Sequence, residues 1–477
     1  MLPWLDQEFK TRLQTRQLWP LETVPTNNGN SERARLAHSL AQWRVQGLAW
    51  TLKRAENSAF YGSKSSVNTP AKRNYLADLT NLAQTLEGIP LDQPAQALEE
   101  RLYEILSQPP LTDPAEVAQN PDLFLAVSQS DVAGVVTVPT SGSTGQAKRI
   151  YSTEADLRNT EAFYHYGVRN LVSPDRPDRV ALLMSGTRPG GVGDLLGRAL
   201  KSWPMEFSVP GFPPLGKPEF IDWFRELNDW RPTCLVGVPA QVLALARHDQ
   251  NYGQNQGLAQ TVRAILLSGD VAPKGLIRAL ENSFPLAKAF LHYGQTEFGL
   301  AGAVECRFHL GPHFREADII LEILAPNGQR QPAGKIGEMV LTSLSREAMP
   351  LIRYRTGDLG AIAVGDCPCG SIFRRIKTFG RLADQVVWRD GQSLRFWEIS
   401  QILYNLPGLV GFKALAPQEP DDRLTLLVNA QGGANGDDGS TERALGKLLA
   451  GRNWEIIYED ERSVQGQATG KQILYKT

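Results

Sequence analysis

The strongest constraint on the fold is a change in the sequence pattern at Gly134. From this point on, short β-branched runs alternate with segments whose apolar residues have helical spacing. The runs are 135–138, 180–184, 233–238 and 264–267, and the helical segments between them include 154–169 and 241–247. Such alternation favours a layered α/β fold built on a largely parallel sheet.

The regions on either side of this core have different patterns. Residues up to about 125 are predicted to be helical, and 31–55 carry apolar residues close to a 3.6-residue period. From about 303 the strand-like runs lie closer together, at 319–324, 338–342, 361–364 and 385–388, which predicts an antiparallel or barrel-like region. The last ninety or so residues predict a small α+β unit with a helix at 397–404, a strand at 424–428 and a surface loop at 431–440.

Composition excludes several classes of protein. The 477 residues include 50 basic and 51 acidic side chains, so the net charge is −1, which argues against a general nucleic-acid binder. No secretory signal pattern starts the sequence, and no apolar run approaches the roughly 18 residues of a membrane span. Four cysteines do not make a disulfide scaffold. We therefore expect a cytoplasmic protein with reduced cysteines and no membrane or nucleic-acid partner.

A glycine- and hydroxyl-rich segment directly follows the run 135–138. Its glycines let backbone N–H groups turn toward an anion, its hydroxyls add donors, and Lys148 adds a positive charge. These features suit a polyphosphate, and the segment comprises Thr140, Ser141, Gly142, Ser143, Thr144, Gly145 and Lys148. It is not a Walker A loop, because Ala147 and Arg149 replace the required glycine and hydroxyl residue. The alternative is a flexible Ser/Gly loop.

Four further motifs carry groups suited to nucleotide chemistry. In Tyr293-Gly294-Gln-Thr296-Glu297, the ring offers a face to a base, the Thr hydroxyl a donor to phosphate, and the carboxylate a ligand to Mg²⁺. In the segment 353–358, a buried carboxylate would accept both hydroxyls of a ribose; the alternative is a salt-bridged turn. The others are a Gly-Arg pair and a Lys on a glycine turn near the C-terminus, and the key residues are Asp358, Arg381 and Lys471.

The order of these motifs resembles the superfamily of acyl-adenylate-forming (AMP-binding) enzymes over roughly residues 130–477. The sequence is similar in particular to the phenylacetate–coenzyme A ligase branch. The shared features are Glu305-Cys306, Gly311-Pro-His313, the segment 347–356 and Cys367-Pro-Cys369-Gly370. The resemblance implies a large N-terminal domain, 1–380, and a small mobile C-terminal lid, 381–477. The helical portion of the large domain, 1–125, is predicted from its own pattern.

The resemblance also implies a role for each matching residue. The segment from Thr140 to Lys148 would hold the β- and γ-phosphates of ATP, Thr296 would contact the α-phosphate, and Glu297 would bind Mg²⁺. The adenine pocket would comprise Ser268, Gly269, Asp270, Tyr293 and Gly294. Asp358 and Arg381 would bind the ribose, and Lys471 would bridge the attacking carboxylate and the α-phosphate. The implied reaction activates a carboxylic acid, expected to be aromatic, to an acyl-adenylate with release of pyrophosphate; transfer to coenzyme A would follow.

The sequence departs from the family pattern at the lid junction. Ala383 occupies the usual hinge position, and Arg389-Asp-Gly391 has an apparent insertion. The acceptor therefore remains open between coenzyme A, a carrier-protein thiol and another nucleophile. A non-catalytic module that binds a nucleotide or acyl-adenylate is the competing class. A P-loop NTPase does not fit the motif.

Two further sets of residues remain to be placed. The first set is a candidate site for a structural Zn²⁺, because three thiols and an imidazole are ligands that this ion prefers. It comprises Cys306, His313, Cys367 and Cys369, with His309 as a substitute ligand. The alternative is that these cysteines are reduced and packed in the core. Walls of an acyl pocket are expected at Gly190, Gly191, Val236, Gly237, Val238, Pro239 and His292, although ordinary strand-end packing explains them equally. The sequence names neither the acid nor the oligomeric state, for which a homodimer is one option.

Overall fold

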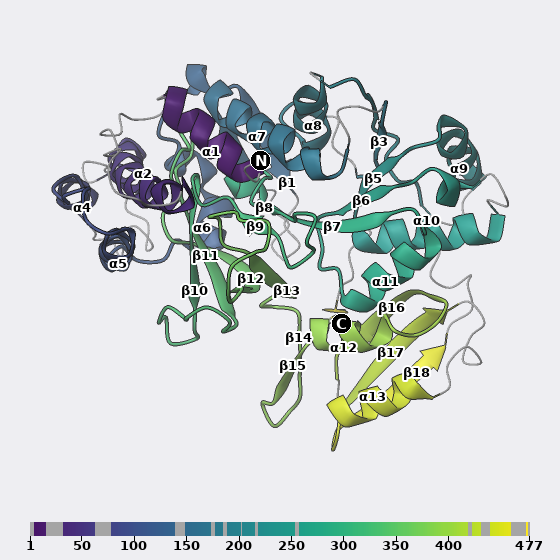
Figure 1. Cartoon of the computed structure of the whole chain (residues 1–477). Coiled ribbons are helices and arrows are strands. Elements are labelled where there is room, and N and C mark those ends of the chain that lie inside the picture. The colour runs from purple at the N-terminus through teal and green to yellow at the C-terminus, as the bar shows by residue number, and fades with distance from the viewer. Residues whose placement is uncertain are drawn as a thin grey trace. The chain divides into compact units, whose positions relative to one another are not determined.

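The computed structural model describes residues 4–15, 32–62, 78–138, 148–172, 177–184, 188–201, 203–214, 218–252, 257–417, 422–430, 439–458 and 474–475. The chain forms two compact units, each assembled from separate segments (Figure 1). The first unit contains Met1–Asn170, Thr187–Ala199 and Tyr293–Lys377, and the second contains Leu171–Gly186, Leu200–His292 and Thr378–Thr477. None of the helices in the described ranges is long and apolar enough to cross a membrane.

Most of an antiparallel sheet of order β10-β11-β12-β13 belongs to the first unit. Its strands are β10 (Ile319–Leu324), β11 (Gly337–Ser343), β12 (Tyr354–Ile362) and β13 (Ile376–Arg381). The runs predicted at 319–324 and 338–342 are confirmed as strands. Within the described residues the sheet stays open, with β10 and β13 at its edges, so the antiparallel expectation is confirmed and the barrel-like one is not. Most of the motif 353–358 lies on β12, so the turn that was its alternative interpretation is not what forms.

The N-terminal helices supply the apolar layer against this sheet. Leu48 and Leu52 of α2 and Leu102 of α5 are buried in one cluster with Ile320 of β10 and Leu341 of β11. The period seen at 31–55 is therefore that of a real core-facing helix. The N-terminal helical elements are α1 (Trp4–Thr15), α2 (Glu32–Ala55), α4 (Leu79–Glu87), α5 (Ala95–Leu106), α6 (Pro114–Gln119), η1 (Pro121–Phe124) and η2 (Gln129–Asp131).

A two-stranded ribbon corrects one expectation from the sequence. The run at 135–138 was predicted to begin the parallel sheet, but it forms β1 (Gly134–Val138), which pairs antiparallel with β2 (Lys148–Ser152). Consecutive strands joined by a short connection pair in this way because a parallel pair needs a long crossover. The remaining elements assigned mainly to this unit are α7 (Glu154–Gly167), η3 (Val168–Asn170), α8 (Val192–Leu200), η6 (Thr296–Phe298), β8 (Ala303–Val304) and β9 (His313–Phe314).

The second unit contains the predicted parallel sheet, with strand order β4-β3-β5-β6-β7. Every residue of β5 and β6 is buried, as expected for parallel strands covered on both faces. The strands are β3 (Arg179–Leu182), β4 (Glu206–Ser208), β5 (Cys234–Gly237), β6 (Ala264–Leu267) and β7 (Lys288–Tyr293). The helical elements beside them are α9 (Pro218–Trp230), α10 (Pro239–Tyr252), η5 (Leu258–Gln260) and α11 (Lys274–Ser283) (Figure 1).

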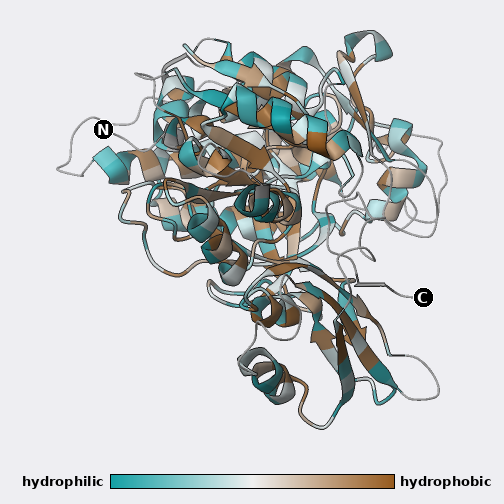
Figure 2. Ribbon diagram, turned by 90° about the vertical axis from the view of Figure 1, so that its right-hand side faces the viewer, coloured by the Kyte–Doolittle hydropathy of each residue, from teal (hydrophilic) through white to brown (hydrophobic). Residues whose placement is uncertain are grey.

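The C-terminal part of the second unit is the predicted α+β arrangement, with a sheet of order β18-β17-β16-β19. Its elements are β14 (Gln385–Val387), β15 (Ser393–Arg395), α12 (Phe396–Leu403), β16 (Leu409–Leu415), β17 (Arg423–Ala430), α13 (Ser440–Leu448), β18 (Asn453–Tyr458) and β19 (Leu474–Tyr475). Leu403 of α12 and Leu424 of β17 are buried in the same cluster as Leu280 of α11. Strands are largely hydrophobic in Figure 2, whereas the helices carry both hydrophobic and hydrophilic residues. The lid boundary at 380/381 remains a prediction, and most of the expected loop, 431–438, lies outside the described residues.

Candidate active site and metal cluster

Several predicted site residues follow the carboxyl ends of three adjacent parallel strands in the second unit. Val238 and Pro239 follow β5, Ser268 follows β6, and His292 lies near the end of β7. Ser268 Oγ and His292 Nδ1 lie 2.9 Å apart and form a hydrogen bond between neighbouring strand ends. The crevice at the carboxyl ends of strands is where open α/β sheets bind ligands. The predicted adenine and acyl residues of this unit therefore gather at the expected edge.

Two glycines at this edge are favoured, one by its backbone conformation and one by close packing. Gly269 has φ +86°, and a Cβ there would lie 3.3 Å from Cε of Met184. A Cβ on Gly237 would approach Cγ2 of Val242 to 2.8 Å, which real side chains do not tolerate. Enclosure of the neighbouring His292 ring lowers its pKa to about 4, so this imidazole is neutral at physiological pH.

A buried ion pair links two motifs in the first unit. Nζ of Lys148, at the start of β2, lies 2.6 Å from Oε1 of Glu297, which lies in η6. The Tyr354 hydroxyl donates to the same Oε1 at 2.6 Å and accepts from Lys148 Nζ at 2.8 Å. Burial raises the pKa of Glu297, but the Lys148 charge and the two hydrogen bonds outweigh it, so the pKa stays below its usual value. The carboxylate is therefore ionised and suited to a hard cation.

Asp358 is a second meeting point of distant motifs in this unit. Its Oδ2 accepts hydrogen bonds from the Tyr293 hydroxyl at 2.9 Å and from Gln295 Nε2 at 2.5 Å. Its backbone N–H donates to Thr356 Oγ1 at 2.9 Å, which fixes this part of β12. A carboxylate that orients two neutral polar groups can also bind hydroxyls, as a ribose presents them.

The arginines that precede Asp358 are structural. Arg353 is buried and makes two hydrogen bonds to the Glu322 carboxylate, at 3.1 and 3.0 Å. Arg355 makes a similar pair with Glu338, but its side chain is 42% exposed. The expectation of a salt bridge at this motif is thus correct for the arginines, while the carboxylate remains the group suited to a ligand.

Three further predicted site residues lie at or next to the ends of helical elements and strands. Thr296 begins η6, next to Glu297, and Arg381 is exposed at the end of β13. Gly190 lies ahead of α8, where its N–H donates to Asp194 Oδ2 at 2.8 Å. The residues of the phosphate segment before Lys148, together with Lys471, lie outside the described residues. Their roles remain predictions.

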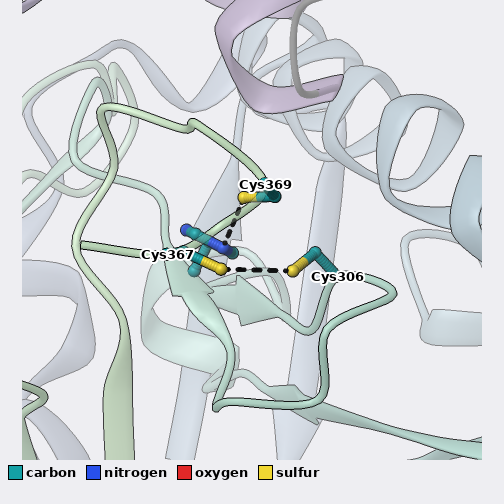
Figure 3. Close-up of side chains that lie close together, drawn as sticks. Cys306, Cys367 and Cys369 are labelled. Carbon is teal, nitrogen blue, oxygen red and sulfur yellow. Dashed lines mark hydrogen bonds between the residues drawn. The ribbon is translucent and has the colours of Figure 1, made fainter. Parts of the chain in front are cut away.

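The three cysteines and the histidine of the predicted metal set come together in the first unit. Their ligand atoms all lie within 4.8 Å of one another, and Figure 3 shows the three sulfurs turned toward a common centre. Cys306 Sγ lies 3.6 Å from Cys367 Sγ, and Cys369 Sγ lies 3.3 Å from His313 Nε2. Sulfurs bound tetrahedrally to zinc at about 2.3 Å would be about 3.8 Å apart. The donor set therefore fits Zn²⁺.

A second contact fixes the orientation of the histidine. Nδ1 of His313 lies 2.8 Å from the carbonyl oxygen of Phe373. Because a carbonyl only accepts, Nδ1 carries the proton and Nε2 presents its lone pair to the sulfurs, as in metal-bound histidines. His309, the substitute ligand, instead lies 3.7 Å from Glu305 and does not join the group. Cys234 is buried in β5, as expected for a core residue.

Sequence reasoning missed three contributors to these sites. Gln295 and Tyr354 stand inside recognised motifs but were given no role, and the Phe373 carbonyl carries no signal in a sequence. Gln295 and Tyr354 could have been identified from the sequence, because each is a polar side chain inside a recognised motif.

Comparison with known proteins places the chain in a family. A sequence model of AMP-binding enzymes matches residues 33–345, more than half of the chain. The chain belongs to the AMP-binding enzyme family. The matched range includes residues 140–148, Glu297 and the carboxyl ends of β5, β6 and β7, and it ends before Asp358 and the C-terminal α+β part.

Relatives of this AMP-binding enzyme include phenylacetate-coenzyme A ligases. The protein from Thermus thermophilus is 27% identical over 39% of this chain and 42% of the relative. The one from Aromatoleum evansii is 29% identical over 47% of this chain and 51% of the relative. The match thus spans about half, or less, of the length of these curated relatives.

Solved structures share the fold over most of the chain. A 2-hydroxyisobutyryl-CoA ligase in the postadenylation state superposes with a TM-score of 0.68 at 20% identity, covering 93% of this chain and 94% of that one. An anthranilate CoA ligase in complex with anthranoyl-AMP gives a TM-score of 0.51 at 16% identity, covering 79% and 75%. At these identities the likeness establishes the fold of this AMP-binding enzyme.

Proposed function

We propose that this AMP-binding enzyme activates a carboxylic acid with ATP and then transfers the acyl group to a thiol. In the first step a carboxylate oxygen bonds to the α-phosphorus, the bond from that phosphorus to the bridging oxygen breaks, and pyrophosphate leaves. In the second step the thiol sulfur bonds to the acyl carbon, AMP leaves, and the thiol proton is released. The observation that carries the proposal is the meeting of separate nucleotide motifs at Glu297 and Asp358 within a family member.

The chain's own residues supply binding and charge. Lys148 and the hydroxyls before it bind the β- and γ-phosphates, and Asp358 and Arg381 bind the ribose. Thr296 contacts the α-phosphate, Tyr293 faces adenine, and Glu297 would hold Mg²⁺, which supplies positive charge to the phosphates. Lys471 offsets the negative charge that develops as the carboxylate approaches phosphorus. The assignments of Lys148, Glu297, Tyr293 and Asp358 rest on the motifs and on the geometry of the first unit, and the other assignments rest on the motifs.

An aromatic acid and coenzyme A are the proposed substrates. Both follow from the names of the relatives, which are phenylacetate-coenzyme A ligases. A carrier-protein thiol is the second candidate acceptor, because a D-alanine–D-alanyl carrier protein ligase of Bacillus velezensis is 25% identical over 35% of this chain. Adding coenzyme A or a carrier protein to the preformed acyl-adenylate, and measuring which of them becomes acylated, distinguishes the two acceptors.

A structural Zn²⁺ completes the proposal. Cys306, Cys367, Cys369 and His313 would hold it, and the ion would tie the loops after β8 and β12 to β9. The closed donor set favours a structural ion over a catalytic one, because no ligand position is left for water.

Lys471→Ala tests the enzymatic assignment. The variant should lose acyl-adenylate formation by orders of magnitude while its affinity for ATP stays within a few fold of the wild type. The matched control is Lys447→Ala, on the exposed side of α13, which should keep full activity. Wild-type protein that binds ATP but forms no acyl-adenylate with any acid would instead identify a binding module.

A further inference from the structure

Glu297 has a positively charged partner inside the protein. Its side chain is 11% exposed, and Lys148 Nζ lies 2.6 Å from Oε1. A buried carboxylate is costly unless it is paired, so this ammonium stabilises the site electrostatically. Any other cation that binds Oε1 is repelled by the positive charge of the Lys148 ammonium.

Tyr354 holds the pair in place. The residue is 1% exposed, and its hydroxyl contacts both Glu297 Oε1 and Lys148 Nζ, at 2.6 and 2.8 Å. Its ring packs against Phe298, with 6.0 Å between ring centroids. Because the ring is packed, the hydroxyl is a fixed donor that stays with Glu297 whichever cation is its partner.

The same two residues have separate partners in the proposed function, on which this inference rests. There Lys148 binds polyphosphate and Glu297 binds a divalent cation. Two cations at one carboxylate oxygen repel each other strongly in a poorly solvated site. The ion pair of Lys148 with Glu297 therefore weakens binding of a divalent cation to the same carboxylate, and the divalent cation weakens the ion pair.

We propose that Lys148 is an internal competitor for the divalent-cation site at Glu297, with Tyr354 as the fixed anchor of the carboxylate. Polyphosphate relieves the competition by drawing the ammonium to itself. The nucleotide thus contributes to metal binding twice, by its own chelation and by removing the competing charge. Metal binding at Glu297 thereby depends on the presence of nucleotide.

Titration of Mg²⁺ into nucleotide-free protein tests the competition directly. Lys148→Met should bind Mg²⁺ at least tenfold more tightly than the wild type, because the competing charge is gone. Lys148→Gln should show the same direction while keeping donors for Glu297 and Tyr354, which guards against a folding defect. Mg²⁺ is the suitable probe because the thiol-rich cluster at Cys306 prefers softer ions.

Two controls define the site. Lys53→Met removes an ammonium from an exposed pair with Glu87 and should leave Mg²⁺ affinity unchanged. Adding Glu297→Gln to Lys148→Met should abolish the gain. If both Lys148 variants bind Mg²⁺ no more tightly than the wild type, or if the gain survives Glu297→Gln, the competition is refuted. The titration needs no turnover, so its failure is separate from a failure to form acyl-adenylate.

Discussion

The Tyr293 hydroxyl donates a 2.9 Å hydrogen bond to Oδ2 of Asp358, across 65 residues of sequence. Gln295 Nε2 donates to the same oxygen at 2.5 Å. Two motifs that each look like an ordinary turn in the sequence therefore converge on one carboxylate. This convergence brings together side chains that we propose bind the nucleotide.

Asp358→Asn should weaken ATP binding. The substitution keeps the shape but removes the negative charge that strengthens hydrogen bonds to ribose hydroxyls. We expect the Kd for ATP, measured by calorimetry, to rise at least tenfold, or about 1.4 kcal/mol. Asp366→Asn, at a side chain that is 78% exposed, should leave the Kd unchanged. Equal affinities for Asp358→Asn and the wild type would remove Asp358 from the nucleotide site.

Two arginines of one motif should differ sharply in their effect on stability. Arg353→Ala leaves the buried Glu322 carboxylate without its bidentate partner, and the free energy of unfolding should fall by about 3–5 kcal/mol. Arg355→Ala breaks a partly exposed pair with Glu338 and should cost about 0–1 kcal/mol. Denaturant unfolding of both variants measures the difference. Similar losses for the two would show that burial does not set the contribution of these pairs.

His292 should stay neutral until the solution is strongly acidic. Its folded pKa of about 4 lies below the ordinary value of 6.5, so the unfolded chain binds the proton more readily. The stability contributed by the neutral ring is therefore complete above pH 6.5 and is lost as the pH falls toward 4. NMR titration, with the signal assigned by its absence in His292→Gln, measures this pKa. A midpoint near 6.5 would contradict the enclosed environment of the ring.

Metal removal should destabilise the first unit. Elemental analysis should find about one zinc per chain, and a strong chelator should lower the melting temperature. Cys369→Ser should lose the zinc and the response to chelator, whereas Cys234→Ser, in the core of β5, should retain zinc. Full stability of metal-depleted protein with intact, reduced thiols would favour packed cysteines instead.

The positions of many helices and strands could be predicted because they depend on local hydrophobic patterns in the sequence. The run at 264–267 matches β6 residue for residue, and the period at 31–55 matches α2. The partner of a strand is not local information. The run at 135–138 is a strand as predicted, but only the structure shows that it pairs with β2 and not with the parallel sheet.

Some features of the candidate site could also be predicted from the sequence, whereas others could not. Residue types suggested a hard-cation ligand at Glu297, a ribose-binding carboxylate at Asp358 and a soft-metal donor set at the cysteines, and the structure brings the cysteine set together. The pairing of Lys148 with Glu297 was not predictable, since each residue suggests an external ligand when it is considered alone. The Phe373 carbonyl behind His313 was invisible because every residue has a backbone carbonyl.

Acid-dependent exchange of labelled pyrophosphate into ATP tests the central claim most directly. The assay reports only reversible attack of a carboxylate on the α-phosphate, so it needs no knowledge of the acyl acceptor. Across a panel of aromatic and short aliphatic acids, we predict exchange that depends on the acid and is strongest with an arylacetic or aromatic acid. Protein that binds ATP yet shows no exchange with any acid of the panel would contradict the assignment as an acid-activating enzyme.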